Sequence, residues 1–235
     1  MTAYEQVRVE DGVFDAYRAD PARTPAPGIV LLQEIFGIND NIRGLSDRLA
    51  EAGYVVLAPD MFWRIERRFE RKDESGLADG MARVQQLDFG KVPGDLAATV
   101  ANLRALPECD GRVGAVGFCL GGTLAFVAAA VAAPDAAVSY YGSGTAAQLE
   151  LLQQISCPLL FHYGENDPYI PEEQIVAVEK AVADRADAAD MTVHRYAAGH
   201  AFSNWDAPSM YDEAAATLAW ERTLAFFARH LAQRT

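Results

Sequence analysis

The stretch that decides the fold is residues 112–122, which read RVGAVGFCLGG. A short apolar run leads into a Gly-x-Cys-x-Gly turn, in which Gly117 and Gly121 flank Cys119. An Ala-rich segment, residues 123–133, follows the turn and predicts a helix. The pattern indicates a strand, a sharp turn and a helix, with a thiol at the tip of the turn.

This spacing is that of a nucleophile elbow, with Cys119 at the position where a serine is usual. An elbow strains the backbone of the nucleophile, and small neighbours relieve the crowding around it. The N-terminus of the following helix would also favour the thiolate form. The alternative is a Gly-rich connection whose cysteine is merely a small buried residue. The catalytic interpretation therefore depends on an acid and a histidine elsewhere in the chain.

Apolar runs alternate with helical patterns on both sides of this stretch. A β-hairpin is expected around Asp11-Gly12, because residues 6–9 and 13–17 alternate polar and apolar side chains. Buried strands are expected at residues 28–32 and 54–58, and further strands at 137–142 and 158–164. Residues 192–196 alternate polar and apolar side chains and are expected to form a strand near a sheet edge. The expected helices are residues 40–52, 96–106, 146–155 and 172–183 and one that carries Trp220, Leu224, Phe227 and Leu231. This alternation predicts a mostly parallel, doubly wound α/β sheet with helices on both faces.

The chain is expected to form one domain, residues 1–235, because no repeat or linker divides it. Residues 61–92, called the excursion below, are the least regular part and carry a run of basic residues. Such a run is usually a solvated surface. Insertions after strand ends also line pockets, so the excursion is an alternative candidate for a substrate-facing lobe.

Composition limits the function further. The 235 residues are 51% hydrophobic and carry a net charge of −13, which argues against nucleic acid or a membrane surface as a partner. The cysteines number 3 and are widely spaced, so neither a disulfide framework nor a metal site is expected. No signal-like segment or membrane-length apolar run is visible, which favours the cytoplasm. We expect a monomer that needs no cofactor.

Four chemically capable side chains sit where predicted strands end: Glu34, Cys119, Asp167 and His200. Ligand sites of open α/β sheets lie beyond the carboxyl ends of the strands, so the fold should gather these groups. Each also has a simpler explanation. Asp167 could only form an Asx turn, His200 could be a core or surface histidine, and Glu34 could cap a helix.

The order Cys119, Asp167, His200 is the order of nucleophile, acid and histidine in α/β-hydrolases. In that arrangement His200 exchanges protons with the thiol and the leaving group, and Asp167 orients the imidazole. The backbone N–H groups of Leu120 and Ile35 are the candidates for an oxyanion hole.

The chain resembles the dienelactone hydrolase (carboxymethylenebutenolidase) family of the α/β-hydrolase superfamily. The resemblance rests on motifs along nearly the whole chain: QEIFG at 33–37, APD at 58–60, GFCLGG at 117–122, YYG at 140–142, Asp167 and AGHAF at 198–202. It implies the α/β-hydrolase fold and a triad of Cys119, His200 and Asp167. It also implies that Glu34 holds the resting thiol neutral until substrate displaces it.

The sequence departs from the family at the arginines that bind the substrate carboxylate. Asn204 stands at one of these positions and Leu77 at the other. We consider Arg64, Arg71 and Arg83 as replacements from elsewhere. The candidate substrate contacts are Asn204, Trp205, Phe36 and Tyr141.

These observations predict a hydrolase that cleaves a lactone or activated ester through a thioester on Cys119. Two alternatives remain open at this point. One is a non-catalytic ligand-binding protein on a hydrolase scaffold, and the other is a thiol redox protein that uses Cys119.

Overall fold

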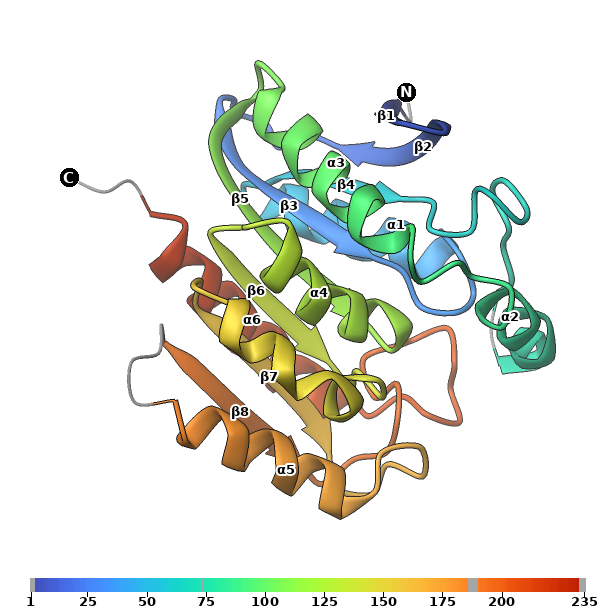
Figure 1. Ribbon diagram of the computed structural model, residues 1–235, viewed down its shortest axis with the longest axis vertical. Helices are drawn as coiled ribbons and strands as arrows, with labels where there is room; N and C mark the ends of the chain where they lie inside the picture. The colour runs from blue at the N-terminus through green and yellow to red at the C-terminus, as the bar shows by residue number, and fades with distance from the viewer. Residues whose placement is uncertain (1–2, 73, 186–189, 233–235) are drawn as a thin grey trace.

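An eight-stranded sheet forms the centre of the computed structural model, which describes residues 3–72, 74–185 and 190–232 (Figure 1). Its strand order is β1-β2-β4-β3-β5-β6-β7-β8. β1 and β2 pair antiparallel and β2 pairs antiparallel with β4, whereas every later pairing is parallel. The strands are β1 (Ala3–Val9), β2 (Gly12–Ala19), β3 (Ala26–Leu32), β4 (Val55–Pro59), β5 (Cys109–Phe118), β6 (Ala136–Tyr140), β7 (Leu159–Gly164) and β8 (Met191–Tyr196).

Helices cover both faces of the sheet. In Figure 1, α3, α4 and α5 lie in front of the strands, and α6 lies behind them. The helices are α1 (Asp40–Glu51), α2 (Leu77–Val84), α3 (Val92–Ala105), α4 (Leu120–Val131), α5 (Glu172–Ala183) and α6 (Glu213–His230), with short 3-10 segments η1 (Glu74–Gly76) and η2 (Thr145–Gln154). This layered arrangement is the α/β-hydrolase fold, as the sequence predicts.

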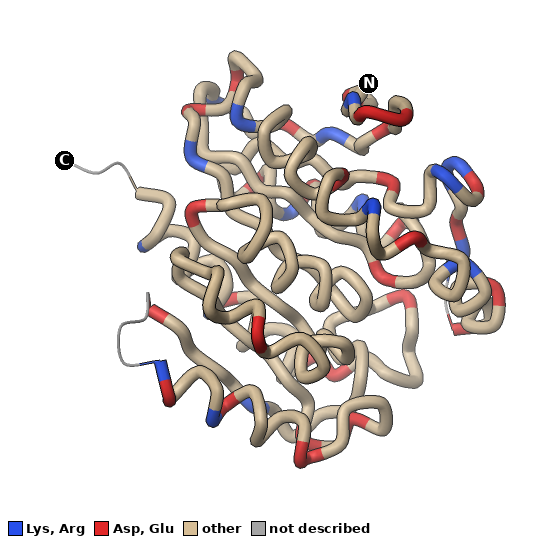
Figure 2. The backbone as a smooth tube through the Cα atoms, in the orientation of Figure 1, with Lys and Arg blue, Asp and Glu red and all other residues tan. Residues whose placement is uncertain are grey.

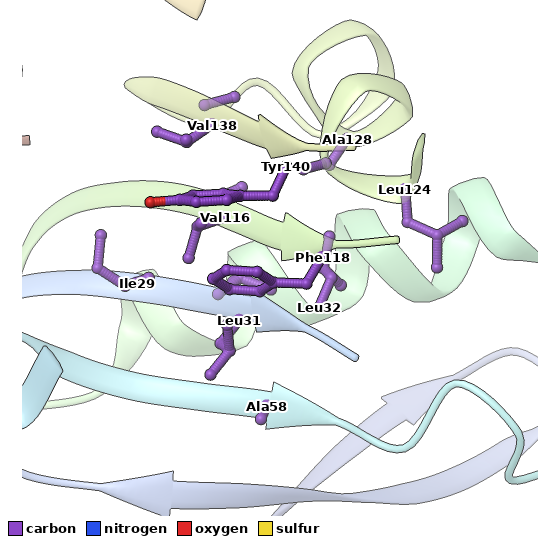
Figure 3. Close-up of a cluster of buried hydrophobic side chains, with 14 of the residues drawn as sticks. Ile29, Leu31, Leu32, Ala58, Val116, Phe118, Leu124, Ala128, Val138 and Tyr140 are labelled. Atoms are coloured by element: carbon purple, nitrogen blue, oxygen red, sulfur yellow. The ribbon is translucent and has the colours of Figure 1, made fainter. Parts of the chain in front are cut away.

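The central strands are apolar on both faces because helices cover both faces. Each residue of β4, β6 and β7 is buried. Phe118 and Tyr140 stack with ring centroids 4.4 Å apart, in the middle of a cluster that joins β3, β5, β6 and α4 (Figure 3). This packing supports the carboxyl ends of β3 and β5, from which Glu34 and Cys119 follow.

Several boundaries differ from the expected ones. α4 begins at Leu120, three residues before the Ala-rich segment, because the elbow leads directly into the helix. β3 begins at Ala26, inside a Pro-containing stretch that looks like a connector. The segment expected as a helix over 146–155 is the 3-10 segment η2, which has a kink at Gln148.

The excursion contains η1 and α2 and carries many of the charged residues at the periphery (Figure 2). Ion pairs attach it to the rest of the fold. Arg64 pairs with Asp11 of the hairpin turn and with the buried Asp95 of α3. The backbone N–H of Arg71 donates to the carbonyl of Phe36, so the excursion runs beside the loop that follows β3.

Candidate active site

The sharp turn after β5 places Cys119 in a backbone conformation that few residues adopt. Its φ is +54° and its ψ is −114°, at the N-terminus of α4. A Cβ on Gly117 would collide with the carbonyl of Gly121, and a Cβ on Gly121 would collide with the carbonyl of Leu32. The two glycines are therefore required by contact between backbones, and the surrounding structure maintains the strain.

Cys119, His200 and Asp167 form a continuous chain of contacts. The Sγ of Cys119 lies 3.1 Å from Nε2 of His200, and Nδ1 of His200 lies 2.6 Å from Oδ2 of Asp167. The other oxygen of Asp167 accepts hydrogen bonds from the backbone N–H groups of Tyr169 and Ile170. Asp167 thus forms the expected Asx-type turn and still offers one oxygen to the histidine.

The surroundings of His200 favour its charged form. Burial acts to lower the pKa of His200, but the charge on Cys119 and the hydrogen bond to Asp167 outweigh burial and raise it above its usual range. The contacts of Nδ1 with Asp167 and of Nε2 with Sγ place His200 between the acid and the sulfur, where the imidazole can exchange a proton with a reacting group.

Glu34 lies close by but has different partners. Its carboxylate accepts hydrogen bonds from Nδ2 of Asn204 and, at 3.4 Å, from the hydroxyl of Tyr141. Burial raises the pKa of Glu34 to about 7, although the charge of His200 and these two donors act to lower it. In this structure the hydrogen-bond partner of the Cys119 thiol is His200, so the geometry differs from the expected resting contact with Glu34.

The candidate oxyanion donors belong to residues on the same wall. Leu120 and Ile35 both line the cavity described below. Leu120 is the first residue of α4, so its N–H has no carbonyl to bond within the helix. α2 packs against the Ile35 side, because a Cβ on Gly80 would strike the carbonyl of Ile35.

A cavity of about 600 Å³ opens over these groups. Glu34, Cys119 and His200 line it, and so does Phe36, one of the four candidate substrate contacts. The excursion supplies much of the remaining wall, through Leu77, Met81, Val84 and Phe89. The excursion therefore faces the cavity with its apolar side, in addition to presenting a charged outer surface.

The other candidate contacts lie elsewhere. Asn204 and Tyr141 are fully buried behind the cavity wall, where both bond Glu34. Trp205 packs on Gly44 and lies 5.7 Å from the guanidinium of Arg48, outside the cavity. These three residues do not line the cavity in this structure, and their contact with a substrate stays a prediction.

None of the arginines considered as replacements lines the cavity. Arg64 pairs with Asp11 and Asp95, Arg71 pairs with Asp79, and Arg83 pairs with Glu66. Each guanidinium is therefore already paired with a carboxylate that does not line the cavity. The idea that one of them replaces the missing family arginines is not supported by this geometry.

Sequence reasoning missed most of the apolar wall. The spacing of Leu77, Met81 and Val84, which is that of one helix face, could have indicated it. Met210 and Ala147 also line the cavity, but they follow irregular segments whose course no sequence pattern gives. In the described part of the chain, no group of three or more His, Cys, Asp and Glu side chains could hold a metal. Nor is any described helix both long enough and apolar enough to cross a bilayer.

A parallel sheet with a strained cysteine after β5, and an acid and a histidine after later strands, defines an α/β-hydrolase. Comparison with known proteins narrows this class. The sequence profile of the dienelactone hydrolase family matches residues 14–231, and the chain belongs to that family of hydrolases.

Curated relatives are similar over almost their whole length. Carboxymethylenebutenolidase 1 of Cupriavidus pinatubonensis (strain JMP 134) is 36% identical over 219 residues, which are 92% of each chain. The carboxymethylenebutenolidase of Pseudomonas sp. (strain P51) is 38% identical, over 93% of this chain and 91% of the relative.

Solved structures of a dienelactone hydrolase and a related enzyme are also similar to this chain. A dienelactone hydrolase-like promiscuous phosphotriesterase from metagenomic libraries superimposes with a TM-score of 0.83 at 25% identity, over 98% of both chains. The dienelactone hydrolase of Anabaena variabilis, at 21% identity, shares the fold with a TM-score of 0.73 over 98% of both chains.

Proposed function

We propose that this chain hydrolyses lactones or activated esters, with Cys119 as nucleophile, His200 as general acid and base, and Asp167 as the group that orients His200. The observation that carries the proposal is the chain of contacts from Asp167 through His200 to the Cys119 sulfur, at the wall of a cavity. The names of the carboxymethylenebutenolidase relatives support a lactone as the substrate class.

The first half-reaction forms a thioester. The Cys119 thiolate attacks the carbonyl carbon, and the resulting oxyanion accepts hydrogen bonds from the N–H groups of Leu120 and Ile35. As the intermediate collapses, the bond to the alcohol oxygen breaks. The proton on Nε2 of His200 passes to that oxygen, which leaves a neutral imidazole and an acylated sulfur.

The second half-reaction removes the acyl group. Neutral His200 takes a proton from water, whose oxygen attacks the thioester carbonyl. The carbon–sulfur bond breaks and the acid leaves. The thiolate and imidazolium pair is thereby restored. Asp167 holds the imidazole through Nδ1, so that Nε2 faces the sulfur in both half-reactions.

Glu34 is proposed as a second hydrogen-bond partner for the neutral thiol, one that holds it protonated in the resting enzyme. Its carboxyl group lines the same cavity, and its pKa of about 7 gives it a proton affinity suited to neutral pH. Cys119 lines the same cavity, so a rotation of the thiol away from His200 can bring it toward this carboxyl group. When the thiol turns from His200 toward Glu34, it rests protonated and is protected from oxidation.

The test is acylation of Cys119. With p-nitrophenyl acetate, the wild type should release a burst of p-nitrophenol and carry one acetyl group on Cys119, as detected by mass spectrometry. Cys119→Ala should lose both signals, and Cys119→Ser, which keeps the shape of the side chain, should lose most of the turnover. Full turnover by Cys119→Ala would refute the proposal.

The rate of iodoacetamide labelling tests the role of Glu34. In the wild type without ligand, labelling of Cys119 should be slow at pH 6, and a lactone analogue that fills the cavity should change it. In Glu34→Gln the labelling rate should rise at pH 6. Fast labelling of the unliganded wild type at pH 6 would contradict the resting role of Glu34.

A further inference from the structure

Apolar side chains make up most of the cavity lining away from the reacting groups, where the polar side chains are those of Thr123, Ser143, Gln148 and Tyr169. The apolar residues come from the excursion, from η2 and from the loop before α6: Leu77, Met81, Val84, Phe89, Ala147 and Met210. Met81 and Phe89 are 44% and 55% exposed, so the apolar surface continues to the cavity mouth. A group that enters here exchanges water for hydrocarbon along most of its path.

Apart from His200 of the reacting groups, this cavity offers no positively charged side chain to a substrate. Among the described residues that line it there is no lysine or arginine. Arg64, Arg71 and Arg83 of the excursion are held in ion pairs outside it, as shown above. His200 is already paired with the carboxylate of Asp167.

The cavity instead contains the carboxyl group of Glu34, and the side chain that bonds this group from behind is the neutral amide of Asn204. Glu34 is 2% exposed and lines the cavity, so its charge is poorly screened by water. Its closest donor is the amide of Asn204, which stabilises the carboxylate without cancelling its charge. A second carboxylate in this space would lose its hydration and gain no charged partner.

We propose that the cavity selects uncharged, apolar lactones or esters and discriminates against substrates that carry a carboxylate. This inference rests on the proposed hydrolysis through Cys119 and names its substrate class. The selectivity belongs to Leu77 and its neighbours on α2 together with the pair of Glu34 and Asn204. The overall charge of −13 acts in the same direction, because it repels anions before they reach the cavity.

The experiment compares two esters of equal chain length. p-Nitrophenyl pentanoate ends in a methyl group, and the mono-p-nitrophenyl ester of glutaric acid ends in a carboxylate. At pH 7.5, after subtraction of the uncatalysed rate, kcat/KM of the wild type should be about 100-fold higher or more for the neutral ester. Equal values, or a preference for the glutarate ester, would overturn the inference.

A charge placed in the wall should reverse this preference in part. Leu77→Arg should raise kcat/KM for the glutarate ester about tenfold or more and lower it for the pentanoate ester. Met81→Arg, at a half-exposed position where the charge stays hydrated, should act in the same direction if Leu77→Arg does not fold. The matched control is Ala78→Arg, which adds the same charge to α2 at an exposed position outside the cavity and should keep the wild-type ratio.

The outcomes separate this inference from the proposed function. If Cys119→Ala still turns over the pentanoate ester, the proposed function fails whatever the selectivity. If turnover depends on Cys119 but the two esters react equally, only the substrate class fails. If Ala78→Arg changes the ratio as much as Leu77→Arg does, long-range charge rather than the cavity wall sets the preference, and the inference is overturned.

Discussion

The elbow and the excursion, two sides of one cavity, are held in place by different kinds of interaction. At the elbow, Gly117 and Gly121 let backbones touch, so the main chain itself fixes the position of Cys119. The excursion is attached largely by side-chain ion pairs, above all by Arg64 between Asp11 and Asp95, together with a backbone hydrogen bond from Arg71 to Phe36. The elbow places the reacting sulfur, whereas the excursion supplies the apolar wall that a substrate would touch.

This difference separates chemistry from selectivity. Because backbone contacts define the elbow, it tolerates almost no substitution. Substitutions in the apolar wall should therefore leave the reaction itself unchanged. A wall held largely by side-chain ion pairs can accept changes in its apolar side chains with less effect on the fold. Changes at the elbow should therefore affect kcat or folding, and changes in the excursion should affect which substrates bind.

The largest effect is expected from Gly117→Ala. The added Cβ collides with the carbonyl of Gly121, so strand and helix must separate, at a cost of about 4 kcal/mol or more. The stability measured by urea unfolding should fall sharply, and so should kcat/KM. The matched control is Gly94→Ala in α3, where a Cβ meets nothing within 4 Å and should stabilise the protein by about 0.5–1 kcal/mol. Wild-type stability of Gly117→Ala would show that the elbow is not fixed by backbone contact.

The next largest effect is expected from Asp167→Asn, which should lower activity without changing stability. The amide no longer balances the charge of His200 or fixes its tautomer, so kcat should fall about 1,000-fold. The Asn Oδ1 can still accept the N–H groups of Tyr169 and Ile170, so thermal unfolding should change little. A loss of activity smaller than tenfold would remove Asp167 from the mechanism.

Glu34→Gln should change how stability depends on pH. The pKa of Glu34 is raised from 4.5 to about 7 by burial, so the folded state binds a proton that the unfolded state has lost between these values. Wild-type stability should therefore fall across this window by about 3 kcal/mol through Glu34 alone. The stability difference between Glu34→Gln and wild type should grow from pH 4.5 to 7 and stay constant above pH 7. A difference independent of pH would contradict this burial penalty.

The family, the fold and the meeting of four groups at one sheet edge were predictable because they depend on local patterns. A buried strand, a Gly-x-Cys-x-Gly turn and a helix specify the elbow wherever they occur together. Asp167 and His200 follow predicted strands, and parallel strands end at the same edge. The catalytic roles of these residues stay predictions until the variants above are measured.

The substrate contacts were less predictable because they depend on the course of irregular segments. Asn204 and Trp205 lie four and five positions after His200, yet one turns behind Glu34 and the other away from the cavity. Arg64 and Arg83 belong to the same excursion as the cavity wall, but their guanidinium groups pair with Asp95 and Glu66, which do not line the cavity. The direction in which such a side chain points is set by tertiary contacts, which a sequence pattern does not contain.

The smallest predicted effect tests the attachment of the wall itself. Arg64→Gln keeps part of the side-chain stem but leaves the buried Asp95 with the indole N–H of Trp63 as its remaining side-chain donor among the described residues. Stability should fall by about 2 kcal/mol. Because α2 belongs to the same excursion, KM for p-nitrophenyl pentanoate should rise about threefold while kcat stays the same.

The control is Arg71→Gln, whose partner Asp79 is half exposed, so its loss should cost less than about 1 kcal/mol and leave KM unchanged. If Arg64→Gln lowered kcat and left KM alone, the excursion would be part of the reacting apparatus rather than a wall. The division between a backbone-fixed elbow and a side-chain-held wall would then be wrong, because a change on one side of the cavity would have altered the chemistry assigned to the other.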